Sequence, residues 1–398
     1  MALYKLKGVV QPYAWGGSDF ISKLIGRTES APAAEYWMGA HDKGAAIVQS
    51  KGQTLKQLID ADPVGMLGNT VAEHFKRLPF LFKVLDVNDM LSIQVHPSKS
   101  EAVKGFAREN ELGIPLDASH RSYKDDNHKP EIMVALSNFW LLHGFKNQHK
   151  MMETLANTDE LKHLLPVFNQ YGYHGLYAEV MRESQEITNR VLRPLINRIQ
   201  TDFQNGDLPK SSPEYWAAKA FRSFCTEDRI DKGIYSIFFF NIVHLKAGEG
   251  IFQDAGIPHA YLQGQNMELM ANSDNVLRGG LTPKHVDVEE LLNQVVFEAT
   301  EPNVLKGRNF GASEVTYDSP AADFELSMLD LDSQESYHQT SSTLEIMIIL
   351  EGATEVTAPS ENLLLEKGEV FAVSAGTAYQ IKASRSSVLY KAKCPVDA

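Results

Sequence analysis

Two residues able to bind a metal lie two positions apart in the stretch SIQVHPSKS, where Gln94 and His96 precede Pro97. Alternate side chains of a β-strand point to one face, so Gln94 and His96 would share a face with Ser92. A half-exposed strand with a wet polar face is the ordinary alternative for this pattern. Pro97 marks the end of the strand, because proline cannot donate a hydrogen bond to a sheet.

Glu131 and His259 are two further candidate ligands. Glu131 opens the apolar run EIMVAL directly after HKP, and His259 follows a proline in AGIPHAY. With Gln94 and His96 they form a set of two imidazoles, one carboxylate and one amide oxygen. A set without thiolates is typical of a metal that acts as a Lewis acid rather than as a structural cross-link. Zinc fits best, and iron, cobalt or manganese would also accept these ligands.

A second group of charged residues lies in the stretch ELMANSDNVLRGGLTPKHVDV. On spacing alone, a purely structural role for these residues is favoured. ANSDN is typical of a turn, and Asp287 with Glu290 fits a helix capping box, which would leave the nearby charges solvated. The candidates for chemistry in this stretch are Glu268, Asp274, Arg278 and Lys284.

The elements that must position these residues are mostly short β-strands. Runs such as LFKVLDV, EIMVAL, YSIFFFNIVHL, LEIMIIL and SVLYKAK are separated by turn residues, which is typical of antiparallel sandwiches and barrels. Residues 148 to about 229 are instead predicted to be helical, because Ile187, Val191, Leu195 and Ile199 recur every four positions. NTDE and SSPEYW are typical helix starts. The pattern favours a helical domain inserted into a β-rich protein.

A weak internal repeat indicates that the β unit is duplicated. AGEGIFQDAGIPHAY, from Ala247, aligns with KGEVFAVSAGTAYQI, from Lys367. In this register His259 falls opposite Tyr379. Only the first unit therefore keeps a metal-binding residue at this position.

The bulk composition limits the location and the partners of the chain. A length of 398 residues with 43% hydrophobic content favours two or three domains. A net charge of -13 without a basic run argues against nucleic acid and anionic membrane surfaces. Cys225 and Cys394 lack metal-type spacing, the start lacks a signal-like apolar segment, and IFFFNIV is too short to cross a bilayer. We therefore expect a cytoplasmic protein that holds anionic ligands through a few local cations.

Taken together, the motifs resemble those of type I mannose-6-phosphate isomerases. The resemblance is carried, in family order, by QPYAWGG, AEYWMGAH, LPFLFKVLDVNDMLSIQVHPSKSEA, NHKPE, AGIPHAYLQG and ELMANSDNVLRGGLTPKHVDV. It covers the first three quarters of the chain, and the last quarter is similar only in its β character. The resemblance implies a mainly β fold with an α-helical insertion, built from two cupin-type jelly-roll barrels and a helical domain.

The implied domains are a catalytic cupin β domain over 1–147 and 235–310, a helical domain over 148–234, and a second cupin-like β domain over 311–398. The implied reaction is the reversible isomerisation of D-mannose 6-phosphate and D-fructose 6-phosphate through an enediol or enediolate. One Zn²⁺ per chain, a monomer and a sugar-phosphate substrate are expected. The implied zinc ligands are Gln94, His96, Glu131 and His259.

The resemblance makes Arg278 the active-site arginine, while other roles stay open. Proton transfer is assigned to Glu268, Lys129 or His128, and ring opening to His128 or Asp274. Lys129 has an alternative as an exposed turn residue, and Glu268 as a carboxylate that orients a ligand. The phosphate candidates are Ser92, Lys99 and Lys284, and the candidates for walls of the sugar site are Trp15 and Tyr261.

Two departures from the family pattern bear on substrate preference. Pro12 replaces a common Asn in QPYAWGG, and Gln253 with Asp254 replaces a more apolar pair in EGIFQDAG. A cupin isomerase of other aldose or ketose specificity is therefore one alternative. A non-enzymatic cupin that binds a metal or sugar is another, although it predicts loss of Arg278 or of a ligand. A metal-dependent oxygenase would require an open iron site and usually more histidine ligands.

Overall fold

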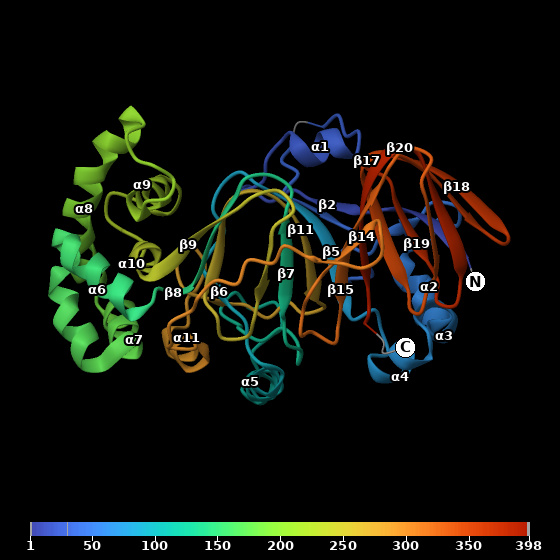
Figure 1. Cartoon of the computed structure of the whole chain (residues 1–398). Helices are drawn as coiled ribbons and strands as arrows, with labels where there is room; N and C mark the ends of the chain where they lie inside the picture. Colours follow the sequence, from blue (N-terminus) through green and yellow to red (C-terminus); the bar gives the residue numbers. More distant parts are fainter. Residues whose placement is uncertain (1, 30, 396–398) are drawn as a thin grey trace.

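A computed structural model describes residues 2–29 and 31–395, so residues 1, 30 and 396–398 of the predicted first and last domains lie outside the described residues. It contains two ten-stranded sheets whose strands pair antiparallel. The sheets lie side by side, and a group of helices packs at the end away from both chain termini (Figure 1). The predicted β-rich fold with a helical segment is confirmed.

The first sheet carries the candidate metal ligands Gln94, Glu131 and His259, and His96 directly follows its strand β6. Its strands are β2 (Val9–Gln11), β3 (Glu35–Trp37), β5 (Phe80–Val87), β6 (Gln94–Val95), β7 (Glu131–Ala135), β8 (Phe139–Phe145), β9 (Phe240–Leu245), β10 (Gly250–Gln253), β11 (His259–Ala271) and β12 (Leu277–Arg278). The long strand β11 pairs with β6 and β8 near its start and with β5 and β7 further along. It therefore joins the two halves of the sheet at the candidate site.

The second sheet contains the C-terminal strands and two strands from the start of the chain. They are β1 (Leu3–Lys7), β4 (Ile47–Val48), β13 (Arg308–Asn309), β14 (Glu314–Tyr317), β15 (Glu325–Leu331), β16 (Ser336–Thr340), β17 (Glu345–Ala358), β18 (Glu361–Glu366), β19 (Val370–Val373) and β20 (Ala378–Lys393). β1 pairs with β19, and β4 pairs with β1. These two strands of the predicted first domain, 1–147, thus pair within the sheet of the C-terminal strands.

Both sheets repeat one order of six strands, as the internal repeat predicts. The order β10-β7-β11-β5-β3-β2 of the first matches β19-β17-β20-β15-β14-β13 of the second. Two glycine pairs of the repeat also share a left-handed backbone. Gly248 and Gly368 have φ of 85° and 83°, and Gly256 and Gly376 have φ of 77° and 74°. Glycine tolerates these values because it has no Cβ, so the same turns recur in both units.

The predicted helical segment is confirmed, and it extends into YSIFFFNIVHL, whose first five residues (235–239) were wrongly predicted as strand. It consists of α6 (Gln148–Asn157), the 3₁₀ helix η1 (Asp159–Leu164), α7 (Leu165–Arg182), α8 (Gln185–Asn205), α9 (Pro213–Phe224) and α10 (Gly233–Phe239). Ser212 caps α9 as SSPEYW predicts, accepting a hydrogen bond from Tyr215 N. NTDE starts η1, although Thr158 makes no side-chain cap there. Leu195 and Ile199 are buried in α8.

The helical segment packs against one face of strands β6 and β12, which carry Gln94 and Arg278. The buried helical side chains form one core with Ile93, Val95 and Leu277. Because side chains alternate along a strand, the intervening Gln94 and Arg278 point away from the helices. The remaining helices are α1 (Phe20–Leu24), α2 (Leu55–Ala61), α3 (Pro63–Leu67), α4 (Asn69–His74), α5 (Lys99–Glu111) and α11 (Val288–Gln294). None of the helices in the described residues is long and apolar enough to cross a membrane.

Candidate metal centre and active site

Four polar residues form a row across neighbouring strands of the first sheet. Arg278 pairs with Gln94, Gln94 with His259, and His259 with His143. Directly opposite residues of antiparallel strands place their side chains on one face. The spacing of two positions between Gln94 and His96 therefore puts both on the face of the sheet that carries His259.

His96, Glu131 and His259 converge on one point. Nε2 of His96 lies 3.4 Å from Glu131 Oε1, and Nε2 of His259 lies 3.4 Å from Glu131 Oε2. All three side chains are buried, and their ligand atoms lie within 4.8 Å of one another. Gln94 lines the same cavity as Glu131 and His259. The structure thus brings the predicted metal-binding set together.

The other nitrogen of each imidazole is held by the backbone. Nδ1 of His96 donates to the carbonyl of Asn275 at 2.9 Å, and Nδ1 of His259 donates to that of Ile257 at 2.9 Å. This arrangement leaves both Nε2 lone pairs aimed inward, as metal-binding histidines require. His96 Nε2 is also a buried atom without a hydrogen-bond partner in the described residues. The donor set therefore fits a zinc ion.

A buried network holds the loop that supplies the Asn275 carbonyl. The Asn275 amide donates to the carbonyls of Asp125 and Asn127, and its Oδ1 accepts from Lys124 N at 2.7 Å. The Asp125 carboxylate accepts from Ser273 Oγ and from Asp274 N, both at 2.7 Å. ANSDN, read from the sequence as turn material, is thus a support for His96.

Electrostatics keep the ligands in their metal-binding protonation states. Burial lowers the pKa of His96 to about 4, so its imidazole is neutral at pH 7. Burial raises the pKa of Glu131, but Lys129 and His96 outweigh it and hold that pKa well below the usual value. Lys129 Nζ lies 3.2 Å from Glu131 Oε1.

A second carboxylate faces the same cavity. Glu268 is buried and ion-paired with Lys83, whose Nζ also lies 3.6 Å from Glu35 Oε2. Burial raises the pKa of Glu268. The pKa of Lys83 is raised because Glu268 and Glu35 outweigh the opposing effect of burial. The lysine therefore remains charged, while Glu268 is shifted toward the range of a general acid or base.

The cavity has a volume of about 70 Å³ and connects the metal ligands with these groups. Its lining includes six of the predicted site residues, namely Gln94, Lys129, Glu131, His259, Tyr261 and Glu268. Burial and the charge of Glu268 raise the pKa of Tyr261 well above its usual value, so its phenol stays protonated. Candidate metal ligands and a titratable acid thus line one cavity.

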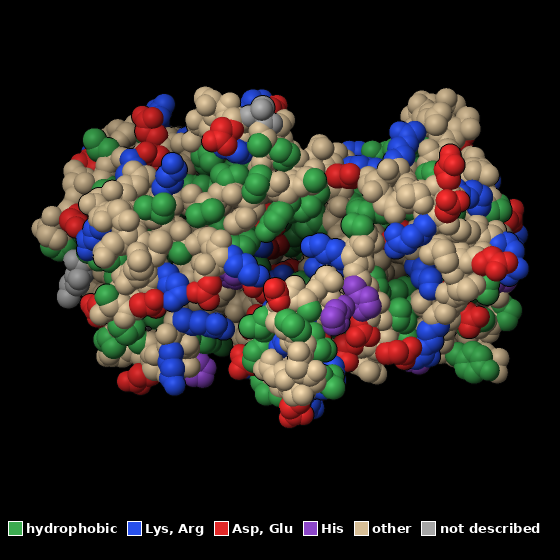
Figure 2. All heavy atoms as spheres, turned by 180° about the vertical axis from the view of Figure 1, so that it is seen from behind, with side chains coloured by type: hydrophobic (Ala, Val, Ile, Leu, Met, Phe, Trp, Pro, Cys, Tyr) green, Lys and Arg blue, Asp and Glu red, His purple; other side chains and the backbone are tan. Residues whose placement is uncertain are grey.

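Arg278 and Lys284 form a cationic edge near this row. Among the described residues neither has a carboxylate within ion-pair distance. Burial lowers the pKa of Arg278, and burial together with the charge of Arg278 lowers that of Lys284. On the face seen in Figure 2, Lys, Arg and His side chains border a hollow near the middle of the molecule. Unpaired cations of this kind favour an anionic ligand.

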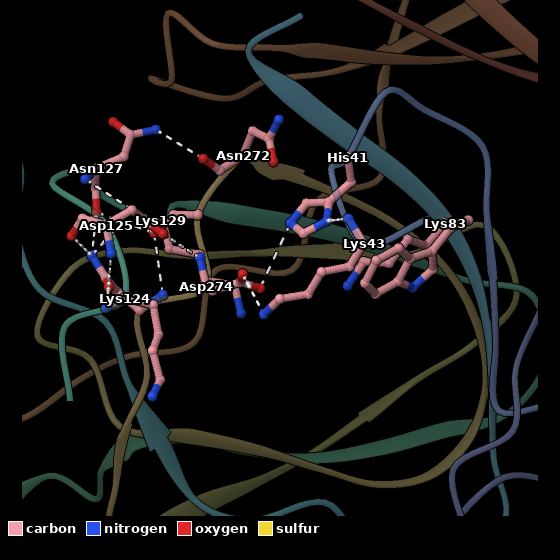
Figure 3. A network of polar contacts seen from close by, with 12 residues as sticks. His41, Lys43, Lys83, Lys124, Asp125, Asn127, Lys129, Asn272 and Asp274 are labelled. Atoms are coloured by element: carbon pink, nitrogen blue, oxygen red, sulfur yellow. Dashed lines mark hydrogen bonds and ion pairs between the residues drawn. The ribbon is translucent and has the colours of Figure 1, made fainter. Parts of the chain in front are cut away.

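Three other predicted residues are engaged elsewhere. His128 Nε2 lies 2.9 Å from Asp323 Oδ2 in the loop before β15, so the structure does not bring it to the cavity. Asp274 pairs with His41 at 3.6 Å and with Lys43 at 2.8 Å (Figure 3). Lys99 Nζ donates to the carbonyl of Asp126 at 2.9 Å.

The remaining two predicted residues lie close by without lining the cavity. Ser92 is half-buried, two residues before Gln94. Trp15 packs at the edge of the core that contains Tyr261, with its ring stacked 5.9 Å from that of Tyr13.

Sequence reasoning missed Lys83 and Glu35. Each lies in an otherwise apolar stretch, Lys83 in FLFKVL and Glu35 in AEYW. A lone charge in a run that reads as a buried strand was the available signal, because such a charge needs a buried partner. Which partner it meets depends on strand order, which the sequence leaves open.

The fold and this cluster define a metal-binding β protein with two related sheets, of which one keeps the ligands. The model of the family described as phosphomannose isomerase type I, catalytic domain, matches residues 3–148. Mannose-6-phosphate isomerase of Escherichia coli (strain K12) is 37% identical over 377 residues, covering 92% of this chain and 93% of that protein. The Salmonella typhimurium protein of that name is 38% identical over 378 residues, with 92% and 93% covered.

Solved structures agree over the full length. A zinc-bound mannose 6-phosphate isomerase is 34% identical, with a TM-score of 0.88 and 100% of both chains covered. The Salmonella typhimurium enzyme bound to its substrate fructose 6-phosphate and to zinc is 34% identical, with a TM-score of 0.89 and 100% of both covered. This chain belongs to the type I mannose-6-phosphate isomerase family.

Proposed function

We propose that the protein catalyses the reversible isomerisation of D-mannose 6-phosphate and D-fructose 6-phosphate. The observation that carries the proposal is that Glu268 lines one cavity together with Glu131 and His259 of the His96–Glu131–His259 cluster. An aldose–ketose isomerisation needs a base and a positive group, because a proton moves between adjacent carbons while negative charge develops on their oxygens, and this combination can supply both. Relatives of this name cover over nine tenths of the chain.

We assign zinc to Gln94, His96, Glu131 and His259, one ion per chain. Bound there, the ion supplies a Lewis acid for the two oxygens that become charged during the reaction. Lys129, beside Glu131, adds a positive charge on the same side of the cavity. Tyr261 forms a wall of the sugar site, and its protonated hydroxyl donates a hydrogen bond to the sugar.

We assign the proton transfer to Glu268. Its pKa is raised by burial, and its contact with Lys83 fixes the position of the carboxylate. A carboxylate with a raised pKa takes a proton from a carbon atom more readily than an ordinary glutamate does, and it can return that proton to the neighbouring carbon. We assign no role in this step to His128, which faces Asp323.

We assign the anionic end of the substrate to Arg278 and Lys284. A phosphate dianion needs charge-assisted donors, and these two cations lack carboxylate partners among the described residues. Arg278 lies in register with Gln94, two strands from His259, which is about 10 Å at the usual strand spacing. That separation suits a hexose phosphate whose carbonyl end would lie beside the residues that would hold the zinc and whose far end would lie at Arg278.

We further infer that both sheets close as cupin-type jelly rolls. In this division the first unit takes 1–147 and 235–310 without β1 and β4, the second takes 311–398 with them, and the helical domain spans 148–234. We infer a monomer, because exposed large apolar side chains such as Tyr171, Phe310 and Leu364 lie on separate elements. A cytoplasmic location accords with two free cysteines.

The test is the rate of fructose 6-phosphate formation from mannose 6-phosphate by zinc-loaded protein. Chelator-treated protein and Arg278→Ala are assayed beside it, with Arg308→Ala as control because Arg308 is exposed in the second sheet. Turnover that chelation and Arg278→Ala abolish, and Arg308→Ala leaves intact, supports the proposal. A folded, zinc-loaded protein without turnover rules this substrate out and directs the assay to other sugar phosphates and to non-enzymatic binding.

A further inference from the structure

Behind the metal ligands lies a second polar pair, His143 on β8 and Gln253 on β10. His143 Nδ1 lies 2.7 Å from Gln253 Oε1, and the two residues are 5% and 0% exposed. Their contact joins β8 and β10, two strands that do not pair in the sheet. Neither residue lines the cavity, so neither is placed to touch the substrate.

The pair stands directly opposite two of the ligands. Gln253 pairs with Glu131 across β10 and β7, and His143 pairs with His259 across β8 and β11. Opposite residues in such strands have Cβ atoms about 4.5 to 5.5 Å apart on one face. The four residues therefore close a ring, in which Glu131 meets His259 at 3.4 Å and Gln253 meets His143 at 2.7 Å.

The Gln253 amide keeps one hydrogen-bonding group unused. Its Nε2 is buried and has no partner within the described residues. A buried donor is costly to leave unpaired, and the neighbouring side chain on the same face is the Glu131 carboxylate, an acceptor. A donor beside a ligand carboxylate is placed to fix its orientation, either directly or through one ordered water.

The second sheet offers a natural comparison. Its strand order is the same, and Val373 takes the place of Gln253, because Val373 pairs with Glu345 as Gln253 pairs with Glu131. There Tyr379 donates directly to Glu345 at 2.5 Å. The sheet with the proposed metal ligands thus has an amide, Gln253, at this position. The sheet without them has an apolar side chain, Val373.

We propose that His143 and Gln253 are positioning residues that hold Glu131 and His259 at ligand spacing before zinc binds. By fixing the two strands that carry these ligands, the pair raises the affinity of the protein for zinc. This inference rests on the metal centre and not on the sugar substrate. It can therefore fail while the isomerase assay succeeds, and the reverse also holds.

The test is the zinc dissociation constant of His143→Leu/Gln253→Leu, measured by competition with a chromogenic chelator. The double change removes both polar groups and so leaves no unpaired partner. We expect the dissociation constant to rise about 10- to 100-fold, as loss of supporting groups around metal ligands commonly causes. Urea unfolding of the metal-free protein should stay close to that of the unchanged protein.

Two further variants make the result decisive. Thr316→Val/Ser327→Ala removes a buried hydroxyl pair, 3.0 Å apart in the second sheet, and should leave zinc affinity unchanged. Gln253→Asn keeps the amide but shortens the side chain, so it tests the same point if the double variant does not fold, with a smaller rise expected. Zinc affinity equal to that of the unchanged protein in the folded double variant, or in Gln253→Asn if the double variant is unfolded, overturns the proposal.

Discussion

Tyr379 occupies in the second sheet the position that His259 holds in the first. The strand pairings extend this relationship to three more positions, where Glu345 corresponds to Glu131, Lys391 to Glu268, and Glu314 to Glu35. In the second sheet the acids already have partners. Lys391 lies 2.6 Å from Glu314, and the Tyr379 hydroxyl donates to Glu345. The Tyr379 phenol thus satisfies the carboxylate whose counterpart in the first sheet, Glu131, is a proposed metal ligand.

The comparison predicts one tight zinc ion per chain, held by the first sheet. His259→Ala removes one of the two assigned imidazole ligands and should reduce bound zinc to background, because the remaining imidazole, carboxylate and amide hold the ion less tightly. Tyr379→Phe should leave zinc at one ion per chain. Elemental analysis after gel filtration measures both, and a second tightly held ion would contradict the assignment.

Lys83→Met should destabilise the protein by about 3 to 5 kcal/mol, because it leaves Glu35 and Glu268 buried without their common cation. Urea unfolding of the metal-free protein provides the measurement. Lys393→Met is the matched control, since its ion pair with Glu325 is partly exposed and should contribute at most about 1 kcal/mol. Equal losses of unfolding free energy in both variants would show that the buried ion pairs of Lys83 with Glu35 and Glu268 stabilise the protein no more than a partly exposed pair does.

Glu268→Gln should lower kcat about 10²- to 10⁴-fold, the usual contribution of a positioned acid or base. Zinc content should not change, because Glu268 is outside the His96–Glu131–His259 cluster. Elemental analysis and the isomerase assay on one preparation separate the two effects. Full activity in this variant would move the proton transfer to Lys129.

The metal-free protein should lose stability as pH falls from about 6.5 to about 4. Burial holds the pKa of His96 and of His143 at about 4 in the fold, against 6.5 ordinarily. The unfolded chain therefore takes up protons first, and each histidine costs about 1.4 kcal/mol per pH unit in that window.

Urea unfolding across this pH range measures the effect. His143→Leu should make the dependence of the unfolding free energy on pH shallower by the contribution of one histidine. An unchanged slope would mean that His143 is protonated in the fold.

Local patterns in the sequence were enough to predict much of the architecture. Four-residue periodicity located α8, and SSPEYW located the start of α9. The repeated glycines located the two equivalent turns, because positive φ restricts those positions. Asp287 caps α11 as predicted, although Glu290 turns instead to Arg108 and Tyr123.

Contacts made between distant segments could not be predicted in this way. β1 belongs to the second sheet because its partner β19 lies at the other end of the chain. His128 turns to Asp323 for the same reason, and the partners of Lys83 depend on β3 and β11 flanking β5. The candidate metal ligands could be proposed from the sequence because few residue types bind a metal, whereas lysines and serines suit many surroundings.

The most direct test of the account is a zinc titration of metal-free protein in which bound zinc and the rate of mannose 6-phosphate isomerisation are followed together. We predict that both rise in parallel and saturate at one zinc per chain, and that His96→Ala abolishes both. Full isomerase activity before zinc is added, or a saturated site without activity, would contradict the account.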